Sequence, residues 1–195
     1  MKLQIPEEET TYLLVDGENI DATLGLSVLG RRPDPDERPR WDRVRDYVSE
    51  TFPGQTKGLF FLNASAHMPM TFVQALLAMD YQPIPLTSEG DEKVVDVGIQ
   101  RTLEAIDKQE YGNVVLVSHD GDFEPQLRSL LRNDHDVTVV GFEEFLSGEL
   151  RVLEESGLKI VDLLLARAMG ATFPLAVPEI PGLQRLRQER LATIK

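Results

Sequence analysis

The chain has 195 residues, 42% of them hydrophobic and 27% charged, which are ordinary values for a globular protein and exclude a disordered or fibrous chain. It has no cysteine, which excludes disulfides and thiolate metal sites, and no apolar run near the roughly 18 residues of a membrane span, so we expect a cytoplasmic protein without membrane contact. The formal net charge of -13 opposes non-specific attraction to nucleic acid, so a polyanionic substrate would need a local basic patch or metal ions.

Short apolar runs and helical patterns alternate along the chain. The expected strands are 11–15, 57–62, 81–86, 114–117, 136–140 and 158–163, and the expected helices are 41–51, 69–79, 95–108 and 123–132. Residues 143–156 are interpreted as a helical or irregular segment. Two prolines in strand 81–86 favour an edge position, because proline cannot donate to a sheet ladder. The alternation predicts an α/β fold, in which a parallel sheet carries helices on both faces.

Acidic residues follow the first and fourth expected strands directly. Asp16 comes right after strand 11–15, and Asp120 and Asp122 come just after strand 114–117. Right-handed crossovers place the carboxyl ends of parallel strands at one edge of the sheet, where ligands bind in open α/β folds. We therefore expect these three carboxylates to meet at that edge.

A fourth carboxylate, Asp96, lies in the first turn of the expected helix 95–108. A first-turn aspartate is favoured by the helix dipole alone, and Asp122 and Asn19 could likewise act only as helix caps. However, Asp96 enters from a loop that follows a strand, so it is expected to reach the same edge as the other acids.

Carboxylates held within a few ångströms repel one another, which favours a bound cation. With no cysteine and no ordered set of histidines, oxygen ligands indicate Mg²⁺ or Mn²⁺ rather than zinc. Such ions can activate a water and stabilise the leaving oxygen of a phosphodiester. The chain lacks a glycine-rich phosphate loop, a Gly-x-Ser-x-Gly elbow and a His-Glu-x-x-His pattern, and an aspartyl phosphatase would want Asp where Glu18 stands.

Residues 30–45 are rich in proline and arginine and contain the only tryptophan, Trp41. They are either a solvated loop or an arm that binds RNA phosphates. In the second case the contacts would come from Arg31, Arg32, Arg38 and Arg40. Trp41 could stack on an unpaired base or belong to the core.

The composition changes at residues 166–195, which contain several prolines and then a basic segment. They are interpreted as a C-terminal extension with a short basic amphipathic helix from Gln184 to Leu191. It could pack on the core, on a partner or on a nucleic acid. His67 follows the second expected strand and is interpreted as an ordinary loop histidine rather than a substrate contact.

Three short motifs occur in order along the chain: Leu-Leu-Val-Asp16-Gly-Glu-Asn19-Ile, Lys93-Val-Val-Asp96-Val and Ser118-His-Asp120-Gly-Asp122-Phe. Together they resemble the motifs of the NYN domain family, the LabA-like branch of the PIN-like nucleases. The resemblance covers roughly residues 10–165, which gives a domain 1–165 followed by the extension 166–195.

The resemblance implies a PIN-like three-layer fold with a central parallel sheet in the order 3-2-1-4-5, so that Asp16 and Asp120 lie on neighbouring strands. It also implies a site for Mg²⁺ or Mn²⁺ and endoribonuclease activity on RNA, taken here as single-stranded. By position, the family's acidic, metal-binding and catalytic residues correspond to Asp16, Asp96, Asp120 and Asp122. Asn19 resembles its polar companion, and Ser118 its small hydroxyl residue.

Two positions depart from the family's pattern. Many members have glycine in place of His119 and an acid in place of Thr102, and loss of that acid argues against a second metal. The alternative function is therefore a catalytically weak RNA-binding or protein-interaction module. The sequence leaves the oligomeric state open, a homo-oligomer included.

Overall fold

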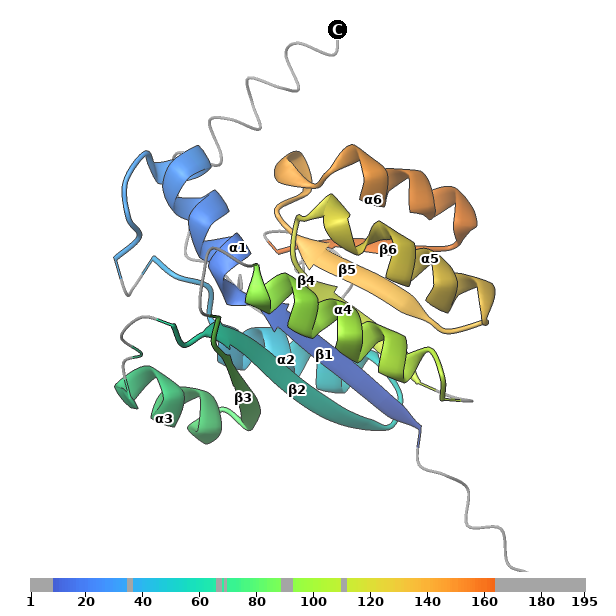
Figure 1. The fold of residues 1–195 in the computed structure, drawn as a ribbon, viewed down its shortest axis with the longest axis horizontal. Coiled ribbons are helices and arrows are strands. Elements are labelled where there is room, and N and C mark those ends of the chain that lie inside the picture. Colours follow the sequence, from blue (N-terminus) through green and yellow to red (C-terminus); the bar gives the residue numbers. More distant parts are fainter. Residues whose placement is uncertain are drawn as a thin grey trace, which may run out of the picture.

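The computed structural model describes residues 9–34, 37–65, 68, 70–88, 93–109 and 112–163. At its centre is a six-stranded sheet in the order β3-β2-β1-β4-β5-β6, with all neighbouring strands parallel (Figure 1). The strands are β1 (Thr10–Asp16), β2 (Gln55–Asn63), β3 (Tyr81–Leu86), β4 (Asn113–Val117), β5 (Val137–Gly141) and β6 (Lys159–Asp162). This confirms the expected order 3-2-1-4-5, and β6 adds a sixth strand beyond β5. The proline-containing β3 lies at one edge, as expected.

Helices cover both faces of the sheet and give three layers. One face carries α1 (Gly17–Ala22), the π-helical turn η1 (Thr23–Leu29), α2 (Trp41–Thr51) and α3 (Met70–Ala78). The other face carries α4 (Val94–Ile106), α5 (Glu124–Arg132) and α6 (Gly148–Val152). Side chains alternate between the two cores along each strand, so that Leu13 and Val15 belong to the first core and Leu14 to the second.

The central strands are mostly apolar because both of their faces are covered. All residues of β4 and β5 are buried, which fits the high content of valine and leucine in those segments. The expected mixed segment 143–156 consists of the short helices η3 (Glu143–Phe145), α6 and η4 (Leu153–Ser156). Between β4 and α5, the residues Gly121–Phe123 form one 3₁₀ turn, η2.

Trp41 belongs to the core. Its side chain is 5% exposed and packs edge-on against the Phe60 ring, with the ring centroids 5.2 Å apart. Of the two roles that the sequence allowed for Trp41, the structure therefore supports the core role. His67 and the extension 166–195 lie outside the described residues, and no helix of the described part is long and apolar enough to span a membrane.

Candidate active site

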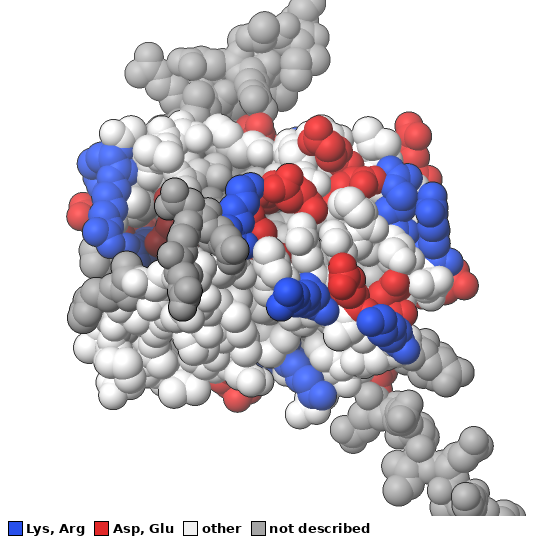
Figure 2. Space-filling model, viewed as in Figure 1, with Lys and Arg blue, Asp and Glu red and all other residues white. Residues whose placement is uncertain are grey.

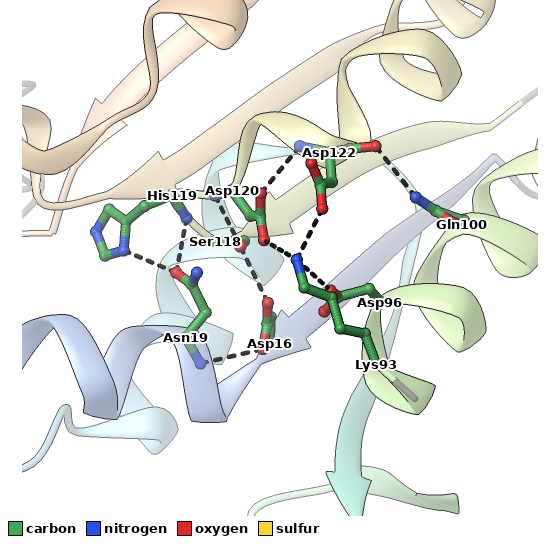
Figure 3. A network of polar contacts seen from close by, with 9 residues as sticks. All are labelled: Asp16, Asn19, Lys93, Asp96, Gln100, Ser118, His119, Asp120 and Asp122. Carbon is green, nitrogen blue, oxygen red and sulfur yellow. Dashed lines mark hydrogen bonds and ion pairs between the residues drawn. The ribbon is translucent and has the colours of Figure 1, made fainter. Parts of the chain in front are cut away.

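The carboxyl ends of β1 and β4 lie side by side, because Val15 pairs with Val117 in the sheet register. The next residue on each strand is polar and buried: Asp16 is 2% exposed and Ser118 is fully buried. The Ser118 hydroxyl donates to Asp16 Oδ2 over 3.1 Å (Figure 3). Asp16 Oδ1 accepts the Asn19 backbone N–H over 3.1 Å and so caps α1. Asp16 thus fixes the start of α1 and the end of β4 together.

Hydrogen bonds from backbone N–H groups to side-chain oxygens hold the turn after Ser118. Asp120 N–H donates to Ser118 Oγ over 3.2 Å, and Asp122 N–H donates to Asp120 Oδ1 over 2.9 Å. The side-chain amide of Gln100, on α4, donates to the Asp122 carbonyl over 3.1 Å. These bonds place the two aspartates of the turn opposite the first turn of α4.

Three carboxylates meet across this gap. One oxygen each from Asp96, Asp120 and Asp122 lies within 4.8 Å of the others. Asp96 therefore does reach the edge of the sheet from the first turn of α4. Asp16 is not in this group of three and is connected to it through Ser118.

Lys93 lies among the three carboxylates. Its Nζ is 2.9 Å from Asp122 Oδ2, 3.4 Å from Asp96 Oδ2 and 4.0 Å from Asp120 Oδ2 (Figure 3). The hydrogen bond from Lys93 to Asp122 and the negative charges around it raise the pKa of the Lys93 ammonium. The sequence motif contained Lys93, but residue pattern alone did not assign it to the site. Its spacing of three residues before Asp96 was the available signal.

Burial and nearby negative charges both raise the pKa values of Asp16 and Asp96. Burial raises the pKa of Asp16 to about 6, and the charges of Asp96 and Asp120 add to this, while the hydrogen bonds from Asn19 and Ser118 act against it. Burial also raises the pKa of Asp96. Each group would lose its proton more readily beside a cation.

The donor set fits a hard divalent cation. All three converging groups are carboxylates, which are oxygen ligands of the kind that Mg²⁺ and Mn²⁺ prefer. An ammonium group already lies among them, so the arrangement favours positive charge. Thr102, at the position of the missing fourth acid, donates to the Gly98 carbonyl over 2.8 Å within α4 and supplies no further charge.

His119 supports the site from behind and is neutral at pH 7. Burial lowers its pKa to about 4. Its Nε2 accepts the Phe142 N–H over 2.8 Å, so in the neutral ring the proton is on Nδ1. His119 N–H and Nδ1–H then both donate to Asn19 Oδ1, each over 2.9 Å. This fixes the Asn19 oxygen on the His119 side and turns its NH₂ group to the other side of the amide.

Three of the four arginines predicted to bind substrate have acidic partners. Ion pairs join Arg31 to Glu37 over 2.6 Å, Arg40 to Asp42 over 2.7 Å and Arg38 to Asp21 over 3.6 Å. The Arg32 guanidinium is exposed and makes no ion pair with any residue that the structure describes. The phosphate-binding role of the arm remains a prediction, and it now centres on Arg32.

The fold and the site together define a PIN-like α/β domain with an acidic cluster at the carboxyl end of its sheet. Comparison with known families matches residues 10–156 to the NYN domain, so the chain belongs to the NYN domain family of PIN-like nucleases. Membership supports a nuclease function related to RNA.

Among solved structures, the fold is similar to that of a protein of unknown function from Vibrio parahaemolyticus. The TM-score is 0.61 at 20% sequence identity, and the match covers 83% of this chain and 96% of that one. At this identity the likeness shows the fold alone. A comparison with curated proteins gave no match.

Proposed function

We propose that this protein is a divalent-metal-dependent endoribonuclease that cleaves single-stranded RNA at the Asp96–Asp120–Asp122 cluster. The observation that carries the proposal is the convergence of three carboxylates within 4.8 Å, at the carboxyl ends of the central strands of an NYN domain. In a chain that is already acidic, three carboxylates held close together repel one another, and a bound cation would relieve this repulsion.

Asp96, Asp120 and Asp122 would hold the ion, Mg²⁺ or Mn²⁺. When bound, it would supply Lewis acidity toward the phosphodiester and an activated water. Ser118 and Asp16 hold the backbone of Asp120 in place through their hydrogen bonds. Asn19 is oriented by His119, so its NH₂ group would donate to an oxygen of the RNA backbone.

Lys93 would exchange its partners during this process. Its Nζ occupies the space between the carboxylates, and its side chain is 66% exposed. A lysine ammonium on a flexible stem can turn toward solvent when a divalent cation takes its place. There it would meet the phosphate that the ion attracts.

The alternative is an NYN module that binds RNA or a protein without cleaving it. The same lysine favours this alternative, because it already neutralises part of the acidic cluster. Thr102 also leaves the cluster with one acid fewer than many family members have. The two functions differ in whether RNA is cut when metal is present.

The test is an assay of a labelled single-stranded RNA with Mn²⁺, with Mg²⁺ and with EDTA. We expect cleavage with metal, none with EDTA, and loss of cleavage in Asp120→Asn and Asp122→Asn. Asp136→Asn is the matched control, because Asp136 is an exposed aspartate that pairs with Lys159 at the opposite end of the sheet. RNA that binds but stays intact with either metal would favour the alternative.

A further inference from the structure

A pocket of about 450 Å³ opens beside α1, within the size range of small-molecule sites. It is lined by Gly17, Asp21 and Gly25, whereas Asn19 and Thr23 contact His119. Residues spaced in this way lie on opposite faces of a helix, so α1 separates the pocket from the acidic cluster. The pocket and the acidic cluster lie at the same edge of the sheet, because Gly17, which lines the pocket, directly follows Asp16 at the carboxyl end of β1.

The walls of the pocket are mostly apolar. They come from Leu26 on η1, Trp41 on α2, Leu62 on β2 and Phe72 on α3. Leu26 is 81% exposed, so most of its side chain is open to contact with a ligand. A flat apolar group that enters the pocket would gain contact with these side chains.

Two polar groups in the pocket lack hydrogen bonds. Asp21 Oδ1 and Arg38 Nε are buried atoms without a hydrogen-bond partner among the described residues, and the ion contact between the two side chains, 3.6 Å, is longer than a hydrogen bond. Buried polar atoms are nearly always hydrogen-bonded, so each such exception needs an explanation. Both residues line the pocket and their side chains remain 32% and 29% exposed, so a ligand can contact these side chains, although the two unpaired atoms are themselves covered.

Charged side chains of both signs line the pocket. Glu18 and Asp21 are acidic, and Arg31 and Arg38 already face acidic partners, so Arg32 carries most of the free positive charge. Arg31, Arg32 and Arg38 all line the pocket, in a chain with net charge -13. In Figure 2, basic side chains lie at the left edge of the molecule, where Figure 1 shows the segment after η1, with acidic side chains beside them. A ligand with a flat apolar body and an attached phosphate matches this combination.

We propose that this pocket binds one unpaired base of the RNA, and that it prefers guanine. Guanine alone among the four bases presents two adjacent N–H donors, N1–H and N2–H, which a carboxylate such as Asp21 can accept together, next to an acceptor, O6, for the Arg38 guanidinium. The phosphate attached to the bound nucleotide would lie near Arg32. The choice of ligand rests on the proposed ribonuclease function, which it deepens by giving the substrate a base contact beside the cleavage site.

Trp41 provides a direct measurement, because it is the only tryptophan of the chain and lines the pocket. We would titrate the full chain with GMP, AMP, CMP and UMP in EDTA and follow its fluorescence. We expect a saturable change with GMP at lower concentration than with the other three. Asp21→Asn should weaken GMP binding about tenfold, as expected for loss of charge-assisted hydrogen bonds.

Ala22→Phe tests the location. Ala22 is exposed and lines the pocket, so a phenylalanine there should fill the pocket without disturbing the core. The matched control is Ala105→Phe, at an exposed position of α4. We expect Ala22→Phe to abolish the response to GMP and to leave Mn²⁺ binding unchanged, while Ala105→Phe behaves like the unaltered protein.

A response to GMP that survives in Ala22→Phe would overturn the pocket assignment, and equal responses to all four nucleotides would overturn the preference for guanine. Because the titration is made in EDTA, it does not depend on catalysis. A protein that cleaves RNA but shows no saturable response to GMP would contradict the base-binding pocket and leave the proposed function standing. A protein that binds GMP but cleaves no RNA would contradict the proposed function and leave the base-binding pocket standing.

Discussion

The Lys93 ammonium lies 2.9 Å from Asp122 Oδ2, in the space where three carboxylates converge. A divalent ion that uses the same oxygens must displace it. Lys93→Met should therefore raise the affinity for Mn²⁺ by roughly tenfold, or about 1.4 kcal/mol. Isothermal titration calorimetry measures this directly.

Lys159→Met is the control for that measurement. Lys159 makes a comparable exposed ion pair with Asp136, over 3.0 Å, at the other end of the sheet, so its removal should leave Mn²⁺ affinity unchanged. Equal or weaker Mn²⁺ binding in Lys93→Met would mean that Lys93 and the ion do not compete for one space.

Asp16→Asn should stabilise the metal-free fold. The folded-state pKa of about 6 lies above the ordinary aspartate value of 3.8, so the folded protein holds this proton more tightly than the unfolded chain. The Asp16 contribution to stability is thus greatest below pH 4 and disappears as pH rises through 6. At pH 7 in EDTA, we expect the variant to gain about 1–3 kcal/mol in denaturant unfolding. A gain that is the same at pH 4 and at pH 7 would contradict a raised pKa.

His119 should show the opposite pH dependence. Its folded-state pKa of about 4 lies below the ordinary value of 6.5, so its contribution to stability is fully present above pH 6.5 and disappears as pH falls toward 4. Among the chain's three histidines, NMR should find one ring that titrates near pH 4, and this signal should be missing in His119→Gln. If the missing signal titrates near 6.5 instead, the neutral ring and its hold on Asn19 are not supported.

Sequence reasoning located the edge of the site because it depends on strand ends. Asp16, Ser118 and Asp120 lie directly after buried strands, and parallel topology brings such positions together without knowledge of side-chain packing. The same reasoning could not place Lys93. The direction taken by a long, exposed lysine depends on charges contributed by a turn 29 residues away, which local pattern does not reveal.

The basic arm shows the same limitation. The sequence shows acids mixed among the arginines, but not which of them pair. Glu37 and Asp42 pair within the segment, whereas Asp21 comes from α1, a contact that only the folded chain creates. The fold therefore leaves much less free positive charge in residues 30–45 than their composition suggests.

Arg32→Ala should weaken RNA binding more than Arg40→Ala does. Arg40 is held by Asp42, whereas the exposed Arg32 guanidinium makes no ion pair among the described residues and acts on Asp21 only through its charge. If Arg32 neutralises one phosphate of a single strand, its removal should make the slope of log Kobs against log salt shallower by about 0.7. Fluorescence anisotropy across a salt series measures both the affinity and the slope. If Arg40→Ala changes the slope and Arg32→Ala does not, the RNA does not pass Arg32 and follows another surface.

The most direct test of the metal site is a crystal structure of the protein soaked in Mn²⁺, with anomalous data collected at a wavelength where manganese scatters strongly. We predict an anomalous peak between Asp96, Asp120 and Asp122, with the Lys93 side chain turned away from them. A structure in which millimolar Mn²⁺ gives no peak there, and Lys93 still bonds to Asp122, would contradict a metal site at this cluster.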